Sequence, residues 1–226
     1  EGRGNEENPI ILTAEEKGKV FMEGNSNLRI TGEYLEVSGL VFRNGHTPTG
    51  EVISFRKDEN HLANNCRLTE CVIDNFNNPE RFETDVWIAM YGKNNRVDHN
   101  TLIGKKNQGV TLMVNLGTEA SRENNHWIEY NYFGPRPTLG SNGGEIIRIG
   151  SSHSSMFYSN SIVEKNFFER CNGEVETISN KSCGNVYRGN VLFECEGALA
   201  LRHGNDGAPL RAESHSPHYG GDRARV

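Results

Sequence analysis

Long hydrophobic runs are missing from this chain of 226 residues, and so is an excess of positive charge. No stretch approaches the roughly 20 apolar residues that a membrane-spanning helix needs, so no membrane span is expected. The net charge is −6, which gives no electrostatic support to a role in binding nucleic acid. An acidic protein can still bind a polyanion, but only through a local cationic site or a bound metal.

Cysteines and aromatic residues are also scarce. The five cysteines include neither a Cys-x-x-Cys pair nor the spacing of a zinc site, so a structural zinc is not expected. Aromatic residues make up 8% and apolar residues 35% of the chain, whereas glycine occurs 25 times. This composition favours many short strands and turns over a helical bundle. No signal-peptide pattern is recognisable, so the chain is expected to be a mature product or an internal fragment.

An internal repeat is the strongest structural signal. Residues 166–179 (NFFERCNGEVETIS) align with residues 190–203 (NVLFECEGALALRH) at a spacing of 24. Weaker copies lie upstream, around Gly39, Cys71, Asn100 and Asn131. Repeats of this length indicate a solenoid, and no clean 3.6-residue period favours helical repeats. The predicted fold is therefore all-β, a right-handed parallel β-helix.

Recurring polar residues predict how neighbouring coils stack. Asparagine tolerates left-handed backbone and bonds its own main chain. An internal amide ladder is therefore expected from Asn100, Asn131, Asn166 and Asn190. One cysteine of each aligned repeat should stack on the other as a buried free thiol rather than form a disulfide, namely Cys171 and Cys195.

The two ends of the chain lack the capping repeats that a solenoid requires. The β-helix domain is expected to span residues 1–205. Residues 206–226 have no alternation and few apolar positions, so they are expected to be disordered or foreign to the fold. Coils that would follow the last strand are expected to be missing, which makes the predicted β-helix a truncated one.

Charged residues gather on one predicted outer wall. Along residues 173–178, alternation places Val175 inward, in line with Leu199 of the next repeat, and turns Glu174 and Glu176 outward. The same wall carries a lysine and an arginine, Lys181 and Arg202. A solvated surface of mixed charges gives the same pattern, so the charges alone leave both interpretations open.

Three segments of this wall resemble the alginate lyase and chondroitinase B family of β-helix lyases, polysaccharide lyase family 6. They are residues 142–155 (NGGEIIRIGSSHSS), 171–185 (CNGEVETISNKSCGN) and 197–205 (GALALRHGN). The likeness extends from about Asn8 to Asn205, and its most specific part is Glu-x-Glu-x-x-x-x-Lys followed by Leu-Arg-His-Gly. The resemblance implies a bacterial enzyme of carbohydrate metabolism, secreted or periplasmic, that cleaves alginate with the help of Ca²⁺.

The resemblance also implies roles for individual residues. It makes Asn142, Glu174 and Glu176 calcium ligands, Lys181 the base and Arg202 the acid. Calcium would neutralise the uronate carboxylate, so that the proton on C5 can be removed and the O4 oxygen expelled. A guanidinium hardly deprotonates, so Arg202 either relays a proton through water or stabilises the departing oxygen.

Three further residues are candidates for binding substrate. Arg148 is expected either to contact a sugar carboxylate or to pair with a nearby glutamate. His203 lies beside Arg202, although alternation turns it to the other face of the strand. His99 lies at a strand end, where a structural role competes with substrate contact.

Other functions remain open from the sequence. A dermatan sulfate lyase of the same family is the nearest alternative. A non-catalytic glycan-binding β-helix and an inactive truncated remnant are the others, and the pairing of Lys181 with Arg202 argues against a binding module. The oligomeric state does not follow from the sequence.

Overall fold

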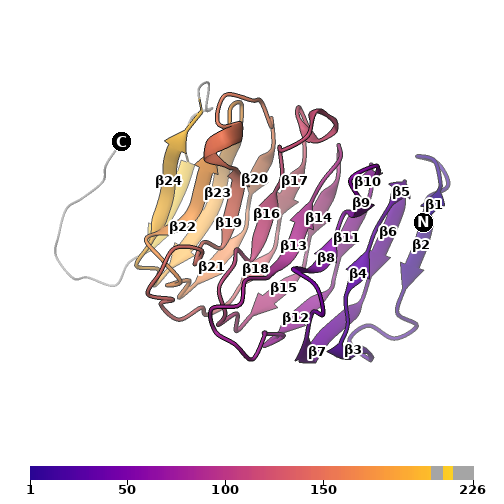
Figure 1. Cartoon of the computed structure of the whole chain (residues 1–226), viewed down its shortest axis with the longest axis horizontal. Coiled ribbons are helices and arrows are strands. Elements are labelled where there is room, and N and C mark those ends of the chain that lie inside the picture. Colours follow the sequence, from indigo (N-terminus) through magenta and orange to yellow (C-terminus); the bar gives the residue numbers. More distant parts are fainter. Residues whose placement is uncertain (205–210, 216–226) are drawn as a thin grey trace.

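The computed structural model describes residues 1–204 and the backbone of residues 211–215. Its strands lie side by side from the N-terminal to the C-terminal end, and each pairs with strands of the neighbouring coils (Figure 1). Among the described strands all pairs are parallel except β9 with β10. This is the predicted parallel β-helix. In the described part of the chain, no helix is long and apolar enough to cross a membrane.

Each full coil contributes one strand to each of three ladders. The first ladder contains β2 (Ile10–Thr13), β6 (Leu35–Ser38), β11 (Arg67–Thr69), β14 (Arg96–Asp98), β17 (Trp127–Glu129), β20 (Ile162–Glu164) and the start of β23 (Val186–Phe193). The second contains β3 (Val20–Asn25), β7 (Leu40–His46), β12 (Val72–Asp74), β15 (Thr101–Ile103), β18 (Tyr132–Phe133), β21 (Phe167–Glu169) and the end of β23. The third contains β4 (Leu28–Arg29), β8 (Glu51–Ser54), β13 (Val86–Met90), β16 (Leu112–Val114), β19 (Ile147–Gly150), β22 (Glu176–Lys181) and β24 (Ala198–His203).

Shorter elements lie outside the three ladders. A small sheet near the N-terminus consists of β1 (Gly2–Arg3), β5 (Gly32–Glu33), β10 (His61–Asn64) and β9 (Arg56–Asp58). Two 3₁₀ turns interrupt the loops, η1 (Glu119–Ser121) and η2 (Ser152–Ser154). Strand β25 (Arg211–His215) pairs in parallel with β23. It is the described part of the predicted tail, and the rest of the prediction for residues 206–226 lies outside the described residues.

A left-handed residue turns the chain between the first and second ladders. The angle φ lies between 52° and 75° at all six of these corners, which are Gly39, Glu70, His99, Tyr130, Lys165 and Gly189. Asparagine follows at the last four corners, and the predicted amide ladder is confirmed. In each step the Nδ2 of one asparagine donates to the Oδ1 of the next at 3.0 Å, along Asn100, Asn131, Asn166 and Asn190.

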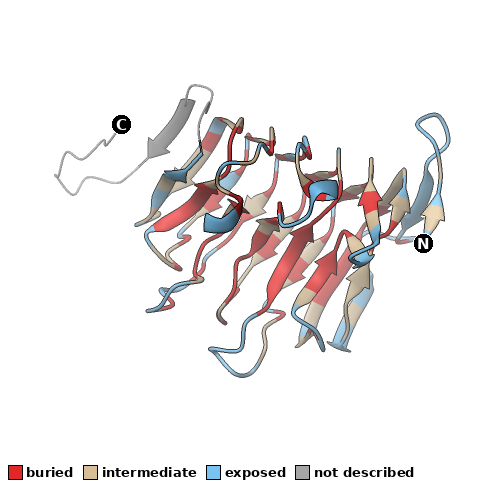
Figure 2. Ribbon diagram, turned by 45° about the horizontal axis from the view of Figure 1, so that its top comes forward, coloured by how far each residue is buried: buried red, intermediate tan, exposed pale blue. Residues whose placement is uncertain are grey.

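The interior of the coils is apolar and continuous along the stack, as the buried residues in Figure 2 show. Phe133 and Phe168 lie in successive coils with their rings stacked at 4.8 Å between centroids. Cys171 and Cys195 are free thiols in the predicted stack, and the Cys171 amide donates to Cys195 Sγ at 3.4 Å. Burial of a large apolar side chain contributes roughly 1.5–3 kcal/mol, so this column of side chains is what holds the coils together.

The predicted alternation near β22 is wrong. Val175 precedes the strand and is 79% exposed, and Leu199 pairs with Ile178 instead. The offset of 24 residues holds in the first two ladders, but the loop before β22 is longer than the loop before β24. In addition, the register shifts between Glu176 and Ile178. A bulge of this kind adds one residue, here Thr177, and breaks the two-residue period on which the prediction rested.

Candidate functional site

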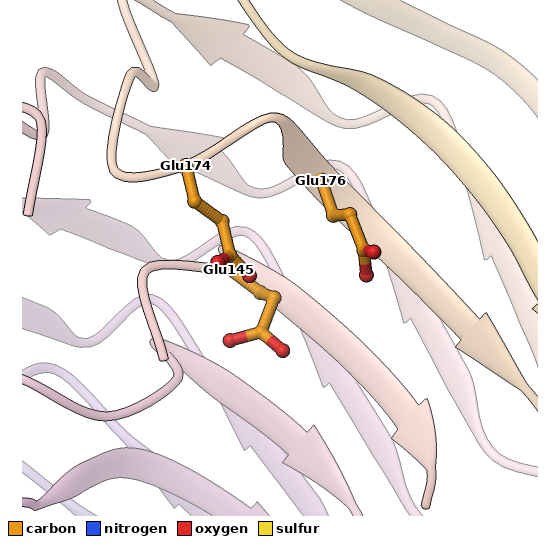
Figure 3. Close-up of side chains that lie close together, drawn as sticks. All are labelled: Glu145, Glu174 and Glu176. Atoms are coloured by element: carbon orange, nitrogen blue, oxygen red, sulfur yellow. The ribbon is translucent and has the colours of Figure 1, made fainter. Parts of the chain in front are cut away.

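Three carboxylates meet where the loops of two coils enter the third ladder. Glu145 lies two residues before β19, Glu174 two residues before β22, and Glu176 begins β22. One oxygen from each lies within 4.8 Å of the others. Figure 3 shows the Glu174 side chain reaching towards Glu145, with Glu176 beside them. Within residues 1–204 this is the one such grouping of His, Cys, Asp and Glu side chains.

Glu145 is the most deeply buried member of this carboxylate cluster, at 1% exposure. Its Oε2 is buried without a hydrogen-bond partner. Its Oε1 lies 3.7 Å from Lys181 Nζ and 3.8 Å from Arg148 Nη1, which is too far for short hydrogen bonds. A buried carboxylate oxygen without a partner is costly. The site therefore suits an additional cation.

Glu174 is the carboxylate of the cluster whose ionisation is disfavoured. Burial raises its pKa to about 7, and repulsion from Glu145 and Glu176 acts in the same direction. Like charges held close together disfavour ionisation, so the cation-free cluster retains a proton near neutral pH.

Glu176 is held in its ionised form. Burial on its own would raise its pKa, but hydrogen bonds from Ser179 and Arg202 outweigh burial and bring the pKa below its ordinary value. Ser179 Oγ donates to Glu176 Oε2 at 2.5 Å, and Arg202 Nη1 donates to Glu176 Oε1. The same contact raises the pKa of Arg202, so its guanidinium stays charged.

The structure brings the predicted base and acid to this cluster. Lys181 is the last residue of β22, its side chain is 13% exposed, and it points to Glu145. Arg202 is an extra residue in β24, because Leu201 pairs with Asn180 while His203 already pairs with Lys181. This bulge sets the Arg202 backbone beside that of Lys181.

The other predicted residues lie at different distances from the cluster. Arg148 joins it through Glu145, and also donates to Met113 Sδ at 3.2 Å. Asn142 is exposed in the loop before Glu145, and its main-chain oxygen accepts a hydrogen bond from Gln108. Its role as a ligand stays a prediction.

Among the described residues, neither histidine side chain is paired with a carboxylate of the cluster. His203 is exposed on β24, and its main-chain oxygen accepts from Asn180 Nδ2 at 2.9 Å. His99 is a corner residue between the first and second ladders, where it bonds Asp98 and stacks on Tyr130. The structure therefore gives His99 a structural role on another side of the coil. Contact of His99 or His203 with substrate stays a prediction.

Glu145 is the carboxylate of this cluster that is not among the predicted ligands. It stands 29 residues before Glu174, which is about one coil, so its position gave a usable signal. Its burial and its lack of a hydrogen-bond partner were not visible in the sequence, because both depend on how the preceding loop folds over it.

The comparisons with known proteins agree with the fold and show the family. The family model described as Chondroitinase B matches residues 1–221. The polysaccharide lyase family 6 alginate lyase AlyGC superposes with a TM-score of 0.90 at 59% identity, over 91% of this chain and 28% of its own. A mannuronic acid specific family 6 lyase from human gut microbiota gives 0.88 at 41% identity, over 91% and 47% of the two chains.

A third relative is the family 6 lyase Pedsa3628 from Pseudopedobacter saltans, with a TM-score of 0.83 at 30% identity over 93% of this chain and 48% of its own. This chain thus spans less than half the length of each of these solved relatives. No curated protein sequence matches it. With a family model that matches nearly its whole length and solved family 6 lyases at 30–59% identity, this chain belongs to the chondroitinase B family, polysaccharide lyase family 6.

Proposed function

We propose that this protein cleaves alginate by calcium-assisted β-elimination, with Lys181 as base and Arg202 acting on the leaving oxygen. The observation that carries the proposal is the buried, unpartnered Glu145 oxygen within a cluster of three carboxylates, with a lysine at its edge. The alginate lyases among the solved relatives support the choice of substrate.

The donor set fits calcium. Calcium takes oxygen ligands, chiefly carboxylates and carbonyls, in a flexible shell of six to eight. Glu145, Glu174 and Glu176 would supply carboxylate oxygens, and Asn142 is the expected amide ligand. The bound ion would neutralise the uronate carboxylate and so make the neighbouring C5 proton more acidic.

We assign the removal of that proton to Lys181. Its nearly buried side chain is anchored on β22 and directed to Glu145, so its amine has few alternative positions. The unprotonated amine accepts the C5 proton, the C5–H electron pair forms the C4–C5 double bond, and the C4–O4 bond breaks. The O4 oxygen leaves with its electron pair and receives a proton from water, which balances the step.

Arg202 serves the leaving group through its charge. Its pairing with Glu176 raises its pKa, so it is a poor proton donor but a persistent cation. We therefore assign it to stabilising the negative charge on O4, with the proton delivered through water. Because a polysaccharide such as alginate is too large to cross the cell membrane, we also propose that the protein is secreted or periplasmic.

The test is an assay of the purified chain on alginate in calcium and in chelator, following the ultraviolet absorbance of the unsaturated product. A calcium-dependent rise supports the proposal. A rise on dermatan sulfate but not on alginate would move the substrate to the nearest alternative. If the folded chain yields no product from either polymer in calcium, the lyase assignment is overturned in favour of a glycan-binding β-helix or an inactive remnant.

A further inference from the structure

A buried arginine lies directly behind the carboxylate cluster. Arg136 follows β18 and is only 2% exposed. Burial lowers its pKa to about 10, so it remains a cation at neutral pH. Among the described residues no carboxylate is paired with it, and its guanidinium instead donates to a hydroxyl and to main-chain carbonyls. A buried charge that is satisfied in this way fixes the backbone around it.

The acceptors of Arg136 belong to loops that enter the third ladder. Nη1 donates to Glu145 O at 2.9 Å and to Thr111 Oγ1 at 3.2 Å. Nη2 donates to the oxygens of Gly109 at 2.8 Å, Gly143 at 3.1 Å and Asn107 at 3.2 Å. Two of these five acceptors therefore lie in residues 143–145, the segment that carries the orphaned glutamate.

Arg136 also contacts the segment that carries the second glutamate. A Cβ added at Gly173 would lie 2.9 Å from both Cδ and Nε of Arg136. A Cβ added at Gly144 would lie 2.4 Å from the Gly173 oxygen. The loops of Glu145 and Glu174 thus meet backbone to backbone through a pair of glycines, with the arginine side chain closing the space behind them.

The two glutamate loops need a contact that holds them together. Its carboxylates repel one another without a cation, and that repulsion pushes the two loops apart. Glu145 and Glu174 lie outside the strands, so only isolated hydrogen bonds secure their segments, such as Thr111 N to Glu145 O at 3.2 Å. A fixed positive charge behind the cluster opposes the repulsion and holds the carbonyls in place.

We propose that Arg136 is a positioning residue that keeps the Glu145 and Glu174 loops together, so that the carboxylates are within binding distance before a cation arrives. The proposal rests on the cation site of the proposed function, but it also predicts a property of the calcium-free protein.

The test compares Arg136→Lys and Arg136→Met with the matched control Lys105→Met. Lys105 is a buried cation of the same group of loops; it shares Asn107 with Arg136, but its other partner is Asp85 and it bonds neither glutamate segment. Calcium affinity is measured by titration calorimetry. Hydrogen exchange in calcium-free protein reports on residues 143–145 and 173–176.

We expect Arg136→Met to weaken calcium binding at least about tenfold, as loss of outer-shell partners does in other metal sites. Arg136→Lys keeps the charge but offers fewer donors, so it should show a smaller loss. Exchange should accelerate in both glutamate segments. Lys105→Met should lower the melting temperature while keeping calcium affinity within about twofold of wild type.

Wild-type calcium affinity and wild-type exchange in a folded Arg136 variant would overturn the inference. If Arg136→Met does not fold, the milder Arg136→Lys decides by the same two readouts. A wild-type chain that binds no calcium would instead defeat the proposed function, whereas exchange in the two segments would still decide the role of Arg136.

Discussion

Two columns of stacked polar side chains run across the coils of this β-helix, and they differ in how their members interact. In the amide column Asn131 and Asn166 each donate to one neighbouring asparagine and accept from another, while Asn100 donates to Asn131 and accepts from the Cys71 amide, so all three are satisfied within the protein. In the carboxylate column Glu145 and Glu174 also occupy successive coils, but when both are ionised neither can donate to the other. Stacked amides satisfy one another's hydrogen bonds, whereas stacked carboxylates need a donor or a cation from elsewhere.

This difference separates stability from function. The amide column lies at a regular corner with a left-handed residue, and it repeats because each coil needs the same turn. The carboxylate column lies where loop lengths vary, and the buried Glu145 oxygen without a hydrogen-bond partner is why we propose it as a cation site. Changes in the first column should affect folding, whereas changes in the second should affect cation binding and catalysis.

The largest effect is expected beside the carboxylate column. Lys181→Ala should lower kcat on alginate by about 10²–10⁴-fold, as loss of a general base does, while the protein stays folded. Turnover is measured from the unsaturated product. The matched control is Lys165→Ala, which removes an exposed corner lysine that bonds Tyr130. Equal turnover in Lys181→Ala and wild type would remove this residue from the mechanism.

Next in size is a break in the amide column. Asn131→Ala leaves the Asn100 main-chain N–H and the Val97 carbonyl without this partner, whereas Asn100 Nδ2 keeps the Leu68 and Asp98 oxygens. Each unsatisfied buried group costs about 1–3 kcal/mol, so we expect a loss of about 3 kcal/mol in the free energy of unfolding. Urea unfolding should show the same loss with and without calcium. A loss that calcium restores would mean that the two columns are not separate.

A smaller effect of opposite sign is expected for Glu174→Gln. Because the pKa of Glu174 is raised to about 7, its ionised form opposes folding, and this penalty grows as the pH rises through 7. In chelator at pH 8 the variant should therefore melt above wild type, by roughly 2–4 °C per kcal/mol of repulsion removed. Calcium should no longer raise its melting temperature. A variant less stable than wild type in chelator would show that repulsion is not the controlling term.

The smallest effect is expected on the pH dependence of stability, through the buried side chain of His126. Burial lowers its pKa to about 3, and its Nδ1 accepts from the Asn95 amide at 3.1 Å. A base with a lowered folded pKa contributes stability above its unfolded pKa of about 6.5, and that contribution is lost as the pH falls towards 3. His126→Asn should flatten this part of the stability profile, measured by urea unfolding from pH 7 to pH 4. An unchanged slope would assign the acid sensitivity to other groups.

The sequence predicted most of what the repeat controls. The parallel β-helix, the amide ladder and the stacked thiols of Cys171 and Cys195 follow from residues that recur in phase. The register of β22 against β24 did not follow, because bulges at Thr177 and Arg202 change which residues face each other. Bulges depend on how neighbouring loops close, and no single strand pattern encodes that.

The candidate site was predicted in part for the same reason. Lys181, Glu174, Glu176 and Arg202 carry a specific spacing, and the structure brings them together. Glu145 and Arg136 were not selected, since their importance comes from burial between loops of three coils. A charged residue that is buried looks like any surface charge until the fold is known.

The most direct test of the central claim is a calcium titration of the purified wild-type chain beside Glu145→Gln, following both the heat of binding and the melting temperature. The carboxylate column should bind calcium and gain stability from it, while Glu145→Gln should lose most of both responses because a main anionic ligand is gone. Equal calcium binding by the folded variant, or none by the folded wild type, would contradict the assignment of this column as a cation site.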